Sequence, residues 1–149
     1  MEAEVVQTEE QLLAVTEKVL RQDQIAQEIN GLFDKVYAWL ERSDIEQVGH
    51  NFAIYQVTEN GLHLRVGFPV SAAFESEGEV TSFALPAGRA AYTLHRGSYT
   101  GLYETNRQLS EWLEAQQLTP AGLFWEEYGD WREDETQLET GVFIQLQDG

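Results

Sequence analysis

The chain has 149 residues, enough for one domain with its own hydrophobic core, and 42% of them are apolar, as in an ordinary globular protein. Asp and Glu number 26 against 9 Lys and Arg, which gives a formal net charge of −17. A surface of this charge repels phosphate groups, which argues against direct binding to nucleic acid or to an anionic membrane. It favours cationic ligands or the basic surface of a protein partner.

The sequence contains no motif for a disulfide, a metal site, a nucleotide site or a serine hydrolase. The chain has no cysteine, which removes disulfides and thiolate zinc ligands. Its histidines lack metal-ligand spacing, and no nucleotide-binding or G-x-S-x-G motif occurs, so we expect no metal and no cofactor. The N-terminal MEAEVVQTEE is acidic rather than signal-like, and no apolar run approaches the roughly 20 residues of a membrane span. We therefore expect a soluble, cytoplasmic protein.

The first half of the chain begins with a predicted strand and a predicted helix. Residues 12–20, LLAVTEKVL, are rich in β-branched and apolar side chains, which are typical of a strand. Asp23 is the expected cap of the helix that follows, over about residues 24–42. Apolar residues recur there at steps of three and four, which predicts one buried helical face: Ile25, Ile29, Leu32, Phe33, Val36, Tyr37 and Leu40.

A β-hairpin is predicted next, from residues 50–57 and 62–70. Asn60-Gly61 between them indicates a type I′ turn, in which both central residues have positive φ. In the second strand Leu62, Leu64, Val66 and Phe68 share one face, so that face is expected to be buried. The stretch 71–88 is polar and interrupted by Gly and Pro, and we expect it to connect the two halves.

The second half repeats the same order of elements. Residues 89–95 predict a strand and residues 99–117 a helix, and two strands follow at 121–131 and 138–146. The inner side of that helix is expected to carry Leu102, Leu109, Trp112 and Leu113.

The repeated order predicts an α+β fold in a single domain, residues 1–149. It would consist of two pseudo-symmetric strand–helix–strand–strand modules, about 12–70 and 88–146. We expect a largely antiparallel sheet with the two helices packed on one side. The other side would then be able to form a concave surface.

Residues 123–131, LFWEEYGDW, place carboxylates among aromatic rings. In an extended strand Phe124, Glu126 and Tyr128 share one face, whereas Glu127 lies on the other. Glu126 is therefore expected to face a cavity in which an organic cation would stack on the rings, at about 0.5–2 kcal/mol per contact. The alternative is that Glu126 is solvated, or hydrogen-bonded to a tyrosine hydroxyl in an ordinary core. Glu127 is expected to be a surface charge.

Other aromatic residues are candidates for the wall of this cavity, and each is equally compatible with a place in the core. They are Tyr55 and Phe68 on the hairpin, Tyr92 on the strand at 89–95, and Tyr99 at the start of the second helix. Trp131 is either a lid over the site or an exposed loop residue. Trp39 and Trp112 are expected to belong to the core.

The segment LPAGRAAYTLHRGSYTGLYETNRQLSEWL, with FWEEY and LETGVFIQL after it, resembles the GyrI-like small-molecule-binding domain. This domain also forms the effector-binding half of multidrug-responsive AraC- and MerR-type regulators. The family pattern has a histidine ending a strand, a glycine two residues on, and then a proline and a tyrosine; here the positions are His95, Gly97, Ser98 and Tyr99. The family's Glu-x-Tyr is matched by Glu126 and Tyr128. Ser98 departs from the usual proline, and Gly129-Asp130-Trp131 replaces the aspartate-proline that often follows.

The resemblance implies two modules related by pseudo-twofold symmetry, with a ligand groove between them and Glu126 at its base. It leaves three functions open. The first is a stand-alone module that binds a lipophilic, cationic or planar aromatic compound. The second is a hydrolase that opens cyclopropane-type electrophiles, with Glu126 as general base and Tyr128 or Tyr99 as acid. The third is an acidic inhibitor of a DNA-binding enzyme such as gyrase. Because regulators of this family carry a helix-turn-helix segment that this chain lacks, we do not expect it to bind DNA on its own.

Overall fold

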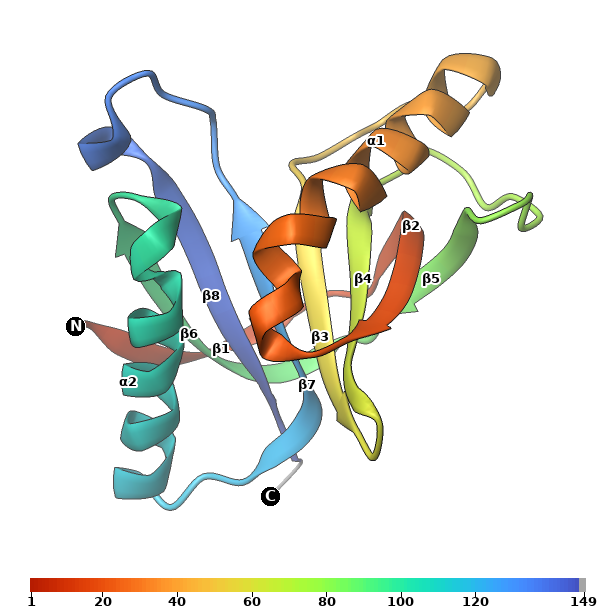
Figure 1. The fold of residues 1–149 in the computed structure, drawn as a ribbon. Coiled ribbons are helices and arrows are strands. Elements are labelled where there is room, and N and C mark those ends of the chain that lie inside the picture. Colours follow the sequence, from red (N-terminus) through yellow and green to blue (C-terminus); the bar gives the residue numbers. More distant parts are fainter. Residues whose placement is uncertain (148–149) are drawn as a thin grey trace. The chain divides into compact units, whose positions relative to one another are not determined.

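Each half of the chain folds as a strand, a helix and two further strands, as the repeated pattern predicts. The computed structural model describes residues 1–147, and it divides into two units (Figure 1). The terminal unit comprises Met1–Glu9 and the chain from Ala87 onward, and the central unit comprises Glu10–Pro86. Residues 148–149 of the predicted domain lie outside the described residues.

The central unit is a four-stranded antiparallel sheet with one helix. Its strands are ordered β3-β4-β2-β5, and α1 lies against β2 and β4. The elements are β2 (Gln11–Leu20), α1 (Ile25–Arg42), β3 (Phe52–Thr58), β4 (Gly61–Pro69) and β5 (Thr81–Leu85).

The terminal unit has the same topology. Its sheet is ordered β1-β6-β8-β7, again antiparallel throughout, and α2 lies against β6 and β8. The elements are β1 (Ala3–Thr8), β6 (Gly88–Arg96), α2 (Leu102–Ala115), β7 (Pro120–Tyr128) and β8 (Glu139–Leu146). In both units the first strand of the module pairs with the last, so the predicted α+β architecture of two like modules is confirmed.

Two strands were not predicted. β1 lies in the acidic N-terminal segment and pairs with β6, and β5 lies in the stretch expected to be a connection and pairs with β2. Neither has the apolar alternation of a half-buried strand, since only Leu85 of these two strands is buried. Each adds a fourth strand to its sheet mainly through backbone pairing, which side-chain patterns do not reveal.

The hairpin turn and the cap of the first helix differ from the predictions. Thr58 pairs with Gly61, so the two turn residues are Glu59 and Asn60, and of the residues at the turn only Gly61 has positive φ, at 132°. The hydroxyl of Thr58 stabilises this turn by accepting from the Asn60 amide at 3.3 Å and donating to the Gly61 carbonyl at 2.9 Å. Asp23 does not cap α1; it lies in a short 3₁₀ turn, Gln22–Gln24, that precedes the helix.

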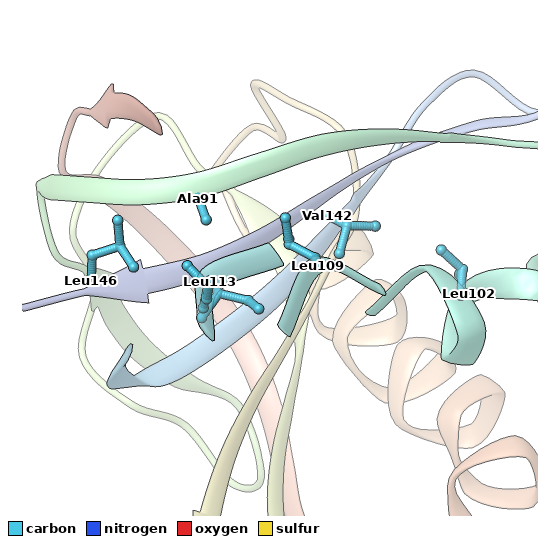
Figure 2. Close-up of a cluster of buried hydrophobic side chains, with 7 residues drawn as sticks. Ala91, Leu102, Leu109, Leu113, Val142 and Leu146 are labelled. Carbon is cyan, nitrogen blue, oxygen red and sulfur yellow. The ribbon is translucent and has the colours of Figure 1, made fainter. Parts of the chain in front are cut away.

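The two helices bury the faces that their periodicity predicts. In the terminal unit, the core between α2 and the sheet (Figure 2) consists of Ala91, Leu102, Leu109, Leu113, Val142, Ile144 and Leu146. In the central unit, the corresponding core consists of Ala14, Val36, Trp39, Phe68, Val70 and Val80. Within residues 1–147, no helix is long and apolar enough to cross a membrane.

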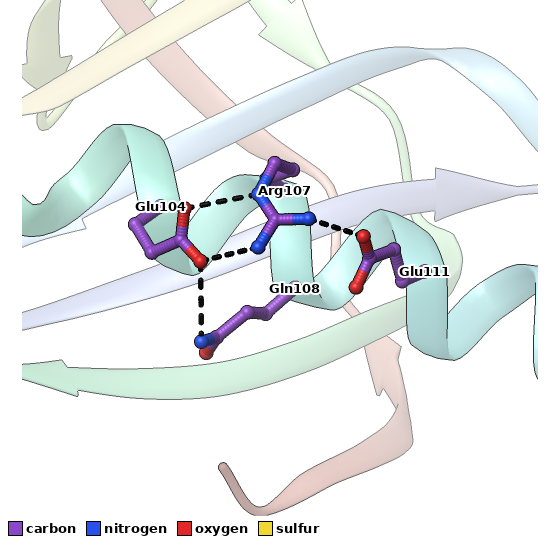
Figure 3. A network of polar contacts seen from close by, with 4 residues as sticks. All are labelled: Glu104, Arg107, Gln108 and Glu111. Atoms are coloured by element: carbon purple, nitrogen blue, oxygen red, sulfur yellow. Dashed lines mark hydrogen bonds and ion pairs between the residues drawn. The ribbon is translucent and has the colours of Figure 1, made fainter.

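Leu109→Ala tests the terminal core, because Leu109 is 0% exposed at the centre of α2. Truncation removes apolar contacts and leaves a cavity, so the free energy of unfolding in urea is expected to fall by about 2–5 kcal/mol. The matched control is Gln108→Ala, one residue earlier on the solvent side of α2 (Figure 3), for which we expect a change within about 0.5 kcal/mol. Equal effects of the two substitutions would contradict this assignment of the buried face.

Candidate functional site

Glu126 is the buried acid of the terminal unit. It is 5% exposed and lies in β7 opposite Val142 of β8, on the face of the sheet that α2 covers. A register shift between Pro120 and Phe124 precedes it, and there the Leu123 amide donates to the side-chain oxygen of Gln145 at 3.3 Å. Pairing resumes at Phe124, which sets Phe124, Glu126 and Tyr128 toward α2.

Each oxygen of the Glu126 carboxylate accepts a hydrogen bond from a neutral group of the same unit. The Tyr128 hydroxyl donates to Oε1 at 2.9 Å, and the Asn106 side-chain amide donates to Oε2 at 3.0 Å. A hydrogen bond from a tyrosine hydroxyl is the alternative to a cavity-facing Glu126 that the sequence leaves open, and Tyr128 makes such a bond. These two donors hold the carboxyl group in place.

The structure shows which face of the sheet carries Glu126, a point that strand alternation leaves open. In the terminal unit Glu126 faces α2, at the end where the helix begins, because its partner Asn106 lies in the second turn of α2.

Asn106 links α2 to β7. Its amide group also donates to the Leu102 carbonyl at 3.0 Å, four residues earlier on the same helix. The opposite face of α2 is charged: Arg107 bonds to Glu104 at 2.9 Å through Nε and pairs with Glu111 (Figure 3). This bond holds the pKa of the Glu104 carboxyl below its usual range. The apolar inner face sets the rotation of α2 against the sheet, and Asn106 lies at the border between this face and the charged one.

Tyr99 is brought beside Tyr128 by the turn that joins β6 to α2. Gly97, with φ of 113°, donates its amide to the Leu138 carbonyl at 2.8 Å, and the Ser98 hydroxyl caps the following 3₁₀ turn by accepting from the Thr100 amide at 3.3 Å. The rings of Tyr99 and Tyr128 then meet edge to face, with centroids 5.5 Å apart. Partial burial raises the pKa of Tyr99, although its side chain remains 42% exposed.

His95 supports this turn rather than forming part of a metal site. Its Nδ1 lies 2.7 Å from the Thr105 hydroxyl and its Nε2 lies 2.9 Å from the Ser98 carbonyl, so β6 is tied to both the turn and α2. A group of three or more His, Asp or Glu side chains able to hold a metal does not occur in the described part of the chain.

The other face of the terminal sheet carries a second set of rings. Trp125 stacks on Phe143 with centroids 5.2 Å apart, and Tyr92 meets Phe143 at 4.9 Å. Burial is the largest cause that raises the pKa of Tyr92, and carboxylates add to it: Glu127, Glu4 and Glu139. Tyr92 thus lies on the opposite side of the sheet from Glu126. The charge of Glu127 helps to raise the pKa of Tyr92.

The remaining predicted wall residues are divided between the units. Phe124 is partly buried against the core under α2, on the same face as Glu126. Trp131 follows β7 and is 73% exposed. Tyr55 and Phe68 belong to the central unit, where Tyr55 is 7% exposed and Phe68 is 0% exposed and packs on Tyr37. The structure therefore brings Glu126, Tyr128, Tyr99 and Phe124 together within one unit.

The model of the GyrI-like small-molecule-binding domain matches residues 1–147. The chain belongs to the GyrI-like family. The match includes β1 and β5, so the family's domain extends beyond the two modules that the sequence pattern predicts.

Solved structures share this GyrI-like fold at low identity. A chain of the EcmrR–DNA complex has a TM-score of 0.84 and 14% identity, over 99% of this chain and 58% of that one. SAV2435 bound to tetraphenylphosphonium has a TM-score of 0.74 and 12% identity, over 99% and 94%. A hydrolase from Listeria innocua has a TM-score of 0.63 and 11% identity, over 98% and 92%. The chain thus spans little more than half of the EcmrR chain, and no curated protein matches it.

The residue that sequence reasoning missed is Asn106. The inner side of α2 was assigned from apolar residues alone, and a polar residue at the border of the apolar stripe gave no reason to connect it with Glu126, 20 positions away. The available signal was its position four residues after Leu102, which places both on one side of the helix.

Tyr92→Phe is expected to reduce the loss of stability of this GyrI-like domain at alkaline pH. The folded-state pKa of Tyr92 is raised above its unfolded value of about 10, so its stabilising contribution is present below about pH 10 and is lost as the pH rises through the folded pKa. The urea midpoint, measured between about pH 8 and pH 11, should therefore fall less steeply in Tyr92→Phe than in the wild type. If the urea midpoints of the two proteins fell in parallel with pH, the raised pKa of Tyr92 would be contradicted.

Proposed function

We propose that this chain binds lipophilic organic cations, including planar aromatic ones, with the Glu126 carboxylate as their counter-ion. The observation that carries the proposal is a carboxyl group, 5% exposed, that hydrogen bonds from Tyr128 and Asn106 hold in place beside aromatic rings. A buried charge is costly, and a cationic guest offsets that cost. The role we propose for this binding is to sense or to sequester such compounds.

The rings beside Glu126 supply the rest of the proposed site. Tyr128 packs on Tyr99, a residue that is 42% exposed, so an aromatic surface reaches from the buried acid toward solvent. Phe124 lies two residues before Glu126 on the same face. A cation stacked on such rings gains about 0.5–2 kcal/mol per contact.

Family membership and charge also support a cationic ligand. The family is one of small-molecule-binding domains, and the similar SAV2435 structure holds tetraphenylphosphonium, which is a lipophilic cation. The formal net charge of −17 raises the local concentration of cations around the protein. Of the predicted wall residues, Tyr92 on the opposite sheet face and the fully buried Phe68 are left out of the proposed site.

Glu126→Gln is expected to weaken binding of tetraphenylphosphonium by about tenfold or more, measured by calorimetry or by quenching of tryptophan fluorescence. Glutamine keeps the size of the side chain and an oxygen for Tyr128, so the substitution removes mainly the charge. Binding of the neutral analogue triphenylphosphine oxide should change little.

The matched control is Glu127→Gln, which removes the same charge one position along β7, on the other face of the sheet. We expect it to retain nearly wild-type affinity for tetraphenylphosphonium. Equal losses in the two variants would show that only the overall charge matters, and no loss in Glu126→Gln would overturn the proposal.

Hydrolysis is the second candidate, because a carboxyl group and a phenol, the groups that would act as general base and general acid, lie together here: the Tyr128 hydroxyl is 2.9 Å from Glu126. Under the binding proposal, a cyclopropane-bearing electrophile incubated with the protein should be recovered intact by mass spectrometry. Turnover beyond one equivalent that Glu126→Gln abolishes would establish the hydrolase instead.

A further inference from the structure

Two buried polar side-chain atoms of the terminal unit lack a hydrogen-bond partner among residues 1–147. They are the side-chain carbonyl oxygen of Asn106, Oδ1, and the Thr140 hydroxyl oxygen. Asn106 bonds directly to Glu126, whereas Thr140 pairs in register with Tyr128 and with His95. Buried polar groups without partners are uncommon and costly, so the Asn106 oxygen next to Glu126 calls for a physical explanation.

The orientation of the Asn106 amide is set by its neighbours. Its NH₂ group donates to Glu126 Oε2 and to the Leu102 carbonyl, each at 3.0 Å. Both partners are acceptors, so the reversed amide would point its oxygen at two other oxygens and lose both bonds. The atom left without a partner is therefore Oδ1, which can only accept.

The unpartnered Asn106 Oδ1 belongs to the same amide group that bonds Glu126, so a donor on a ligand at Glu126 would satisfy it. A cation with an N–H group donates to Oδ1 and offsets the charge of Glu126 at once. A quaternary ammonium or phosphonium cation offsets the charge but leaves Oδ1 without a partner.

We infer that this site selects organic cations that carry an N–H group over cations without one, and that Asn106 determines the selectivity. The preferred class is protonated aromatic amines, amidines and guanidines. The inference rests on the proposed function, since it concerns the same ligand site. A buried water molecule bonded to Oδ1 is the competing explanation, and it removes any preference for a donor.

A matched pair of cations separates these explanations. The probes are (2-naphthylmethyl)dimethylammonium and (2-naphthylmethyl)trimethylammonium, which share one ring system and one positive charge and differ by an N–H replaced with N–CH₃. The extra methyl group by itself favours the trimethyl compound through apolar burial. Tighter binding of the dimethyl compound therefore requires an acceptor in the site.

In calorimetry at neutral pH, the wild type is expected to bind the dimethyl compound about tenfold more tightly than the trimethyl compound. In Asn106→Ala that ratio should fall to about one or below. Gln108→Ala removes an amide from the solvent side of the same helix and should retain the wild-type ratio. The wild-type comparison needs no variant, so the test stands even where Asn106→Ala does not fold.

The outcomes distinguish this inference from the proposed function. Equal affinities in the wild type, with both weakened in Glu126→Gln, would overturn the selectivity and leave the proposed function in place. Affinities that Glu126→Gln leaves unchanged would overturn the proposed function itself. A wild-type preference that persists in Asn106→Ala would overturn the role of Asn106.

Discussion

The buried carboxylate of Glu126 is the constraint on which the site in the terminal unit depends. A carboxyl group removed from water must be hydrogen-bonded, and the donors come from two different elements: Tyr128 on the same strand and Asn106 on α2. Pairing of β7 with β8 from Phe124 onward sets Glu126 toward the helix, and the buried apolar face of α2 sets Asn106 toward the strand. If β7 or α2 were rotated, the Asn106 amide would no longer reach the Glu126 carboxylate.

Much of the fold follows from periodicity. The helix and strand patterns predict both modules, because each buried face repeats at 3.6 or 2 residues, and Leu109 and Val142 lie where these periods place them. β1 and β5 escaped prediction because backbone pairing rather than a buried side-chain face defines them. The hairpin turn differed by one residue because the Thr58 hydroxyl stabilises a turn centred on Glu59 and Asn60.

The site was predictable only in part. Strand alternation groups Glu126 with Phe124 and Tyr128, and this holds in the structure. Alternation does not show which face the helix covers, and it carries no information on partners from another element. The bond to Asn106 therefore depends on how α2 packs on the sheet, which the strand pattern does not contain. The same holds for the contact of Tyr99 with Tyr128, which the turn between β6 and α2 brings about.

We propose that an organic cation binds at the Glu126 carboxylate, on the α2 side of the terminal sheet. The decisive measurement is a crystal structure of the protein with (2-naphthylmethyl)dimethylammonium. We expect the ammonium nitrogen within about 3 Å of Asn106 Oδ1 or of a Glu126 oxygen, with the naphthyl ring against Tyr99 or Tyr128. A cation bound on the opposite face, among Tyr92, Phe143 and Glu127, would contradict it.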